Sequence, residues 1–187
     1  MQRRSTMSLN YSRQLLGTSV IALSLLLSAC GFQLRGTGVD NVQLEELRLS
    51  ARNSYGQTYM QVREALEIDG VRLSDSASYH LQLLDESQSR DVVSYTSRAT
   101  PAELELTSRL TFQVSDKQGR ALIGPETLSA QRVFVNDKDN IIGSSEEEQL
   151  LQREIRRDLT RQMLFRLSSL SESELASREQ ALDQQAR

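Results

Sequence analysis

The alternation of apolar and polar side chains is clearest between Ala102 and Ser115. Every second residue is apolar or small, whereas the residues between them are polar or charged. The first set is Ala102, Leu104, Leu106, Ser108, Leu110, Phe112 and Val114. A period of two is typical of a sheet that has one buried face and one polar face. The pattern therefore predicts a long amphipathic strand.

Shorter segments of similar character predict further strands. They are residues 32–36, 47–51, 79–83, 91–96 and 128–135. The polar stretch 85–90 separates two of these segments, and we expect it to twist or bulge the chain. Asp116–Gly119 predicts a turn in which the glycine supplies positive φ.

Apolar residues at helical spacing occur in two places. From Tyr59 to Leu66 they predict a helix over 56–69, with Ser54 and Gln57 in the positions of a capping box.

The second helical pattern is longer. An apolar stripe from Leu151 to Leu170 predicts a helix over 146–169, opened by a capping box of Ser145 and Glu148.

The order of these elements is strand, helix, several strands, helix. It predicts an α+β fold, a two-layer sandwich in which two amphipathic helices pack on one mainly antiparallel sheet of about four strands. We expect this domain to span residues 30–170. The polar tail, 171–187, is expected to be disordered or partly helical.

The N-terminus has a different character. Three arginines and no acidic residue are followed by an apolar run over 15–27. This run is shorter than the ~18–20 residues that span a bilayer. With the small residues before Cys30 it predicts a cleaved signal peptide over 1–29. Leu27–Cys30 resembles the lipobox of bacterial lipoproteins, in which lipid is joined to the cysteine sulfur.

Composition narrows the possible functions. After residue 29 the chain has 19 basic and 25 acidic residues, a net charge of −6, which argues against a nucleic-acid partner. Cys30 is the only cysteine, which excludes an intramolecular disulfide. Arginine greatly outnumbers lysine, which suits bidentate anion contacts but equally fits a genomic composition bias.

Catalytic chemistry has little support in the sequence. His80 is the only histidine and lies in a predicted strand, where a structural role is expected. Glu103 and Glu105 share the polar face of the long strand, where solvation explains them. We therefore expect no enzyme activity, no metal and no cofactor other than the lipid on Cys30.

The segment Cys30–Arg35 reads C-G-F-Q-L-R. With the lipobox and the order of elements, it resembles the LPS-assembly lipoprotein family (LptE). The resemblance implies a non-catalytic lipoprotein in the cell outer membrane. Its partners would be lipopolysaccharide and the LPS-assembly β-barrel (LptD-type), which such lipoproteins plug and help to assemble. Gly31, rather than Asp, after the cysteine also favours the outer membrane.

The resemblance also implies a lipopolysaccharide contact at the basic residue before the long strand, which is Arg98 here. A second basic position, before the last helix, is Ser144 in this chain, with Lys138 upstream. Arg109 and Arg132 are further candidates from the strand pattern alone. Each of these side chains has a simpler interpretation as a solvated surface cation.

A second function stays open at this point. A periplasm-facing lipoprotein that acts as a binding or scaffold module for envelope integrity, outside lipopolysaccharide transport, would have the same leader and a similar domain.

Overall fold

The computed structural model describes residues 42–186. The predicted signal peptide at 1–29, the predicted lipidation site Cys30 and the predicted strand at 32–36 lie outside the described residues.

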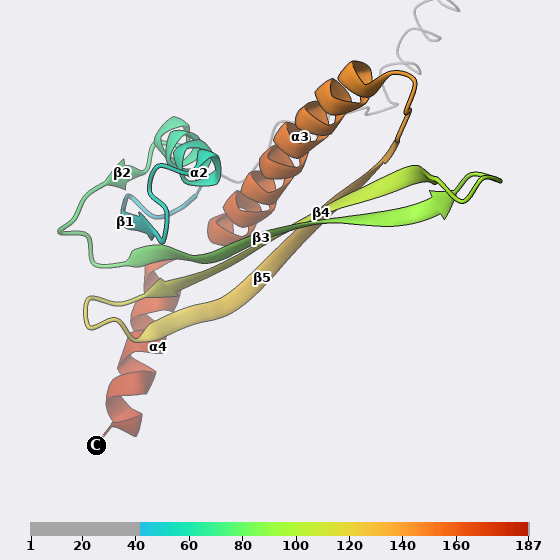
Figure 1. Cartoon of the computed structure of the whole chain (residues 1–187). Helices are drawn as coiled ribbons and strands as arrows, with labels where there is room; N and C mark the ends of the chain where they lie inside the picture. Colours follow the sequence, from blue (N-terminus) through green and yellow to red (C-terminus); the bar gives the residue numbers. More distant parts are fainter. Residues whose placement is uncertain (1–41, 187) are drawn as a thin grey trace, which may run out of the picture. The chain divides into compact units, whose positions relative to one another are not determined.

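The described residues form five strands and three helices (Figure 1). In chain order these are β1 (Glu46–Ala51), α2 (Gln57–Ile68), β2 (Arg72–Leu73), β3 (His80–Tyr95), β4 (Pro101–Ser115), β5 (Ala121–Val135), α3 (Ile141–Ser168) and α4 (Glu172–Gln185).

The strands form one mixed sheet in the order β2-β1-β3-β4-β5. β1 pairs in parallel with both β2 and β3. Helix α2 carries the chain back before β2, and the loop over residues 74–79 carries it back before β3. β3, β4 and β5 are antiparallel. The predicted α+β class is confirmed, and the short strand β2 brings the number of strands to five.

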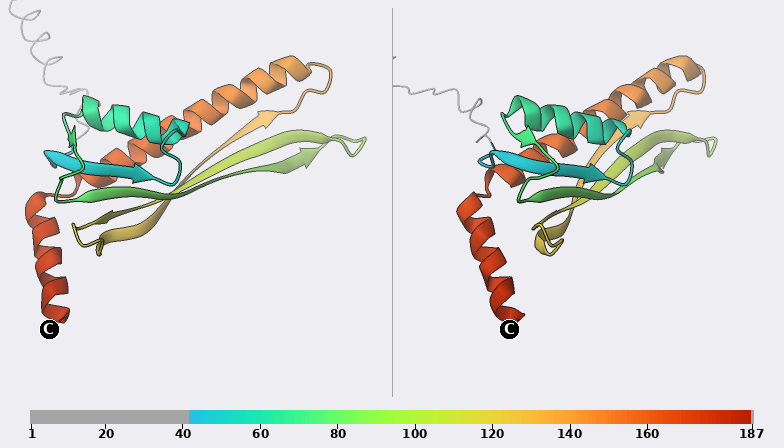
Figure 2. Two further views of the ribbon diagram at one scale, coloured as in Figure 1. Left: turned by 60° about the vertical axis from the view of Figure 1, so that its left-hand side comes forward. Right: turned by 90° about the vertical axis from the view of Figure 1, so that its left-hand side faces the viewer.

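Helices α2 and α3 lie on the same face of the sheet, as both views in Figure 2 show. On β4 the predicted alternation holds, since Leu104, Leu106, Leu110, Phe112 and Val114 are all buried. On α3 the predicted stripe is also buried from Ile155 to Leu167. The two sets of side chains form one core.

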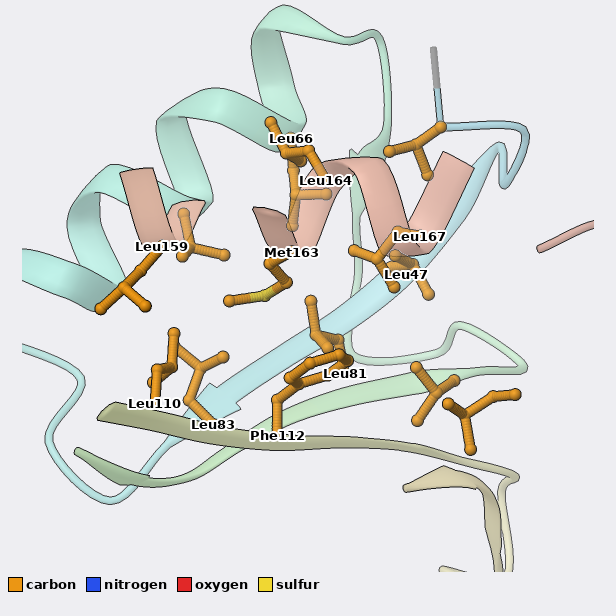
Figure 3. Packing of buried hydrophobic residues seen from close by; sticks show 14 of the residues in the cluster. Leu47, Leu66, Leu81, Leu83, Leu110, Phe112, Leu159, Met163, Leu164 and Leu167 are labelled. Atoms are coloured by element: carbon orange, nitrogen blue, oxygen red, sulfur yellow. The ribbon is translucent and has the colours of Figure 1, made fainter. Parts of the chain in front are cut away.

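Leu47, Leu81 and Phe112 rise from the strands toward Met163 and Leu66 on the two helices (Figure 3). All five are essentially inaccessible to solvent. Burial of a large apolar side chain contributes about 1.5–3 kcal/mol, so this cluster accounts for much of the stability.

Two predicted strands, 79–83 and 91–96, are parts of the single strand β3. The polar stretch between them continues the pairing with β4, and the register shifts between Leu83 and Asp85. The predicted irregularity is therefore confirmed as a local bulge. The strand stays intact across it because β4 supplies an unbroken partner.

The prediction for β5 was too short. The strand begins at Ala121 rather than at residue 128. Gly124 and Pro125 made the first half of β5 look unlike a strand in the sequence, because both residues are usually found outside strand interiors. Pairing with β4 accommodates them through a register shift between Phe112 and Val114.

Both predicted capping boxes were wrong. Helix α2 is preceded by Gly56, and no side chain caps its N-terminus. Helix α3 begins at Ile141, five residues before the predicted start, because the Asn140 side chain accepts a hydrogen bond from the Gly143 amide at 3.1 Å.

The polar tail forms helix α4 over most of its length. Ser171 caps it by accepting the Glu174 amide at 3.2 Å. Leu175 is completely buried, and Arg120 in the turn before β5 binds Asp183 at 2.6 Å. Composition left a disordered and a partly helical segment open, because a single buried leucine among polar residues leaves little sequence signal.

Candidate functional site

The site lies at the far end of the long β3–β4 hairpin, where β5 leads into α3. We call residues 92–101 and 133–142 the tip. In the first of these segments, the Thr96 amide donates to the Thr100 carbonyl at 2.8 Å. The Thr96 hydroxyl accepts from the amides of Arg98 and Thr100, each at 3.3 Å. The backbone that carries Arg98 is thus fixed by local hydrogen bonds.

The second segment of the tip is tied to the first. The Asn136 amide donates to the Ala102 carbonyl at 2.8 Å, and its side chain donates to the Pro101 carbonyl at 3.2 Å. The Ser144 hydroxyl accepts from the Asp137 amide at 3.1 Å and donates to the Asp137 carbonyl at 3.2 Å. Ser144 therefore anchors the turn that carries Lys138.

Arg98 and Lys138 line the same cleft, which has a volume of about 540 Å³. Among the described residues, no carboxylate lies within 4.0 Å of either cation. Asp137 and Asp139 also line the cleft, and one Asp137 oxygen accepts the Asp139 amide at 2.9 Å. The cleft is therefore a site of mixed charge with two accessible cations.

Exposed apolar side chains surround this end of the sheet. Within residues 42–186, twelve large hydrophobic residues are exposed and seven of them belong to this end. Ile141 and Ile142 are the most exposed of the seven, at 74% and 76%. The seven are Val92, Val93, Tyr95, Val133, Val135, Ile141 and Ile142. Exposed apolar patches of this kind are typical of surfaces that contact an apolar ligand or partner.

The two remaining candidates lie elsewhere. Arg109 is exposed in the middle of β4, opposite Ser87 and Ser129. Arg132 turns toward α3 and pairs with Asp158 at 3.3 Å and with Glu154 at 3.9 Å. The structure therefore brings together only Arg98 and Lys138 of the four predicted contacts.

Residues considered for catalysis make structural contacts. His80 shares a hydrogen bond with the Ser50 hydroxyl at 2.7 Å, and burial, with a smaller effect of Arg48, lowers its pKa. Glu103 accepts from the Ser94 hydroxyl at 2.7 Å.

Within residues 42–186, no group of three His, Cys, Asp or Glu residues could hold a metal ion. In the same range, no helix is both long enough and apolar enough to cross a membrane.

The sequence did not indicate the scaffold of the tip or its apolar border. Asn136, Asp137 and Asn140 form a polar turn sequence that signals a loop, but nothing in it shows that Ser144 folds back onto the turn. The early start of α3 also moves Lys138 next to the helix. The position at which the family resemblance expects a basic residue is Ser144, which lies inside α3.

Comparison with known proteins gives consistent results. Residues 44–167 match the family described as "LptE: Lipopolysaccharide-assembly". The LPS-assembly lipoprotein LptE of Pectobacterium atrosepticum is 30% identical over 177 residues, which cover 91% of this chain and 95% of the relative. The protein of the same name from Photorhabdus laumondii is 28% identical and covers 90% and 94%.

Solved structures share the fold. Rare lipoprotein B from Shewanella oneidensis superposes with a TM-score of 0.56 at 27% identity, over 74% of this chain and 98% of that one. A minor lipoprotein from Acinetobacter baumannii gives a TM-score of 0.58 at 28% identity, over 67% and 91%.

Proposed function

Because the chain belongs to the LptE family of lipopolysaccharide-assembly proteins, we propose that it is the non-catalytic lipoprotein subunit of the outer-membrane lipopolysaccharide translocon. In this role it plugs the LPS-assembly β-barrel, helps it to assemble, and takes part in placing lipopolysaccharide in the outer leaflet. Lipid on Cys30 would anchor it to the outer membrane.

The observation that carries the proposal is the pairing of Arg98 and Lys138 on one cleft beside exposed apolar residues. Lipopolysaccharide presents phosphates next to acyl chains, so a binding site needs cations next to apolar surface. Guanidinium and ammonium groups donate charge-assisted hydrogen bonds to phosphate oxygens. Val135 lines the same cleft and is 60% exposed, so it provides apolar surface beside the two cations.

The open face of the sheet supports a position inside a barrel. Polar side chains hydrogen-bond across it, as Gln113 does with Gln82 at 2.5 Å and Thr111 with Thr127 at 2.8 Å. The interior of an outer-membrane barrel is polar, so a plug needs a surface of this kind.

Lipidation is the expected means of anchoring. Each buried CH₂ contributes about 0.8 kcal/mol, so two or more acyl chains on Cys30 would hold the protein stably at a membrane. Cys30→Ala should release a folded protein into the soluble fraction, as judged by membrane fractionation.

Extraction in a mild detergent tests the central claim. The native protein should co-purify with one large β-barrel protein, and its depletion should reduce lipopolysaccharide at the cell surface. Recovery as a free monomer, together with unchanged lipopolysaccharide display after depletion, would instead favour the envelope scaffold function.

A further inference from the structure

A second cationic surface lies on the outer side of α3, away from the tip. Arg153, Arg157 and Arg161 are four residues apart, so they follow one another along one face of the helix. All three are exposed. Leu150 and Phe165 continue the same face at its two ends and are 46% and 69% exposed. We call these five residues the α3 ridge.

The charges on this ridge are poorly compensated within the described chain. Arg153 and Arg157 have no carboxylate within 4.0 Å among residues 42–186. Arg161 approaches only Asp158, at 3.4 Å, and that carboxylate also binds Arg132. Like charges four residues apart on a helix repel one another and destabilise it slightly. The ridge therefore lowers the stability of the free protein slightly.

Some other arginines of the described domain are paired. Arg63 binds Glu67 at 3.0 Å and Arg166 binds Glu126 at 2.9 Å. Arg72, Arg98, Arg109 and Arg156 also have no carboxylate within 4.0 Å among the described residues, so what distinguishes the ridge is that its arginines follow one another on a single helix face.

A cleft of about 520 Å³ runs beside the ridge, between α3 and α2. Arg157 and Arg161 form part of its border, and Ala65, Leu164 and the highly exposed Ile68 supply apolar lining. Figure 2 shows both helices on the same side of the sheet, with no further element of the described residues covering them.

We propose that the α3 ridge and this cleft form the docking surface for a protein partner that presents carboxylates around an apolar side chain. Planar guanidinium groups match carboxylates bidentately. Arginine and aromatic residues are enriched in protein interfaces, and Phe165 is accessible for such a contact. This inference rests on the proposed function, in which the partner is the inner wall of the barrel.

A protein occupant fits this surface better than a lipid. The apolar lining is small, and charged residues, including Glu64 and Glu154, interrupt it. It can hold one side chain but offers no continuous surface for an acyl chain. The tip, with seven exposed hydrophobic residues, has the opposite character.

Site-specific photocrosslinking in cells tests the inference with the full lipidated chain and its native partners. A benzophenone amino acid replaces Arg157 in one variant, Phe165 in a second and Lys117, an exposed residue in the β4–β5 turn, in a control. We expect adducts with the barrel from positions 157 and 165 and none from position 117.

The outcomes separate the two proposals. If the barrel co-purifies but positions 157 and 165 give no barrel adduct, or give only lipid adducts, the docking surface is wrong and the proposed function stands. If no barrel co-purifies with any variant, the proposed function fails and the inference fails with it.

Charge reversal provides a second measurement. Arg157→Glu combined with Arg161→Glu should lower the barrel recovered in 0.5 M salt by about tenfold, since opposite charges across an interface become like charges. Arg72→Glu combined with Lys117→Glu reverses two exposed cations elsewhere and should leave recovery unchanged. Equal recovery from both double variants, with unchanged circular dichroism, would overturn the inference.

Discussion

The base and the tip of the sheet share strands β3, β4 and β5 but differ in how these strands are covered. At the base, where α2 and α3 pack around Phe112, the side chains are inaccessible to solvent. At the tip, Tyr95 and Val135 are more than half exposed, and local hydrogen bonds from Thr96 and Ser144 fix the turns. We therefore expect changes at the base to lower stability most and changes at the tip to weaken the proposed binding most.

The largest expected effect comes from removing the central aromatic side chain of the base. Phe112→Ala should lower the free energy of unfolding by about 3–5 kcal/mol, because it leaves a cavity in a closely packed core. Urea denaturation measures this change. Tyr95→Ala at the tip should alter it by less than about 0.5 kcal/mol. Similar losses from both variants would remove the distinction between the two regions.

The matching experiment at the tip concerns binding. Arg98→Asp combined with Lys138→Asp should weaken binding of purified lipopolysaccharide about tenfold, or ~1.4 kcal/mol, while the urea midpoint stays unchanged. Arg109→Asp, on the same sheet but outside the cleft, should have a smaller effect. If it weakens binding equally, only diffuse charge matters and the tip is not a specific site.

A smaller effect concerns Asp116 in the turn near α4. Burial alone would raise the pKa of this carboxyl, but hydrogen bonds from the Arg120 amide and guanidinium and from the Gln118 amide outweigh it and lower the pKa. The ionised form therefore stabilises the fold above the unfolded-state pKa near ~3.9, and this contribution disappears as pH falls through the lower folded-state value.

Thermal unfolding of Asp116→Asn checks this assignment. The variant should melt about 2–4 °C below the wild type at pH 7. The gap should narrow as the pH falls below about 4, and lipopolysaccharide binding should not change. A gap that stays constant down to pH 2.5 would show that the charge of Asp116 is unimportant.

The smallest effect is expected from Arg132, which pairs with two carboxylates on α3. Partly exposed ion pairs contribute about 0.2–1 kcal/mol. Arg132→Gln should therefore reduce stability within that range and leave lipopolysaccharide binding unchanged. Weakened lipopolysaccharide binding with normal stability would instead support the prediction that Arg132 contacts lipopolysaccharide.

The sequence predicted the features that depend on the local pattern of apolar and polar residues. It did not predict the features that depend on contacts between distant residues. The period of two on β4 and the stripe on α3 record burial directly, so the core from Leu104 to Leu167 was predicted well. The first residues of α3 and β5 were predicted wrongly. Capping by Asn140 and pairing across Gly124 depend on three-dimensional geometry, which the local pattern does not show.

The site followed the same rule. The family resemblance indicated Arg98, and the strand pattern indicated Arg109 and Arg132. Only the structure shows that Lys138 lines the same cleft as Arg98. Their proximity arises from the Asn136 contact between the two segments of the tip, which joins residues far apart in the chain. Two of the three arginine candidates, Arg109 and Arg132, lie outside the cleft. The alternation of residues along a strand indicates which face of the sheet a side chain is on, but it does not indicate how close that side chain is to the cleft.

The length of the three long strands has a mechanical consequence. Fifteen or sixteen residues at about 3.3 Å each extend for roughly 50 Å, whereas the hydrocarbon core of a bilayer is about 30 Å thick. A protein held firmly at its base can therefore present the opposite end at a very different depth. With such reach, a tethered subunit could contact a ligand beyond the leaflet that anchors it without any large movement.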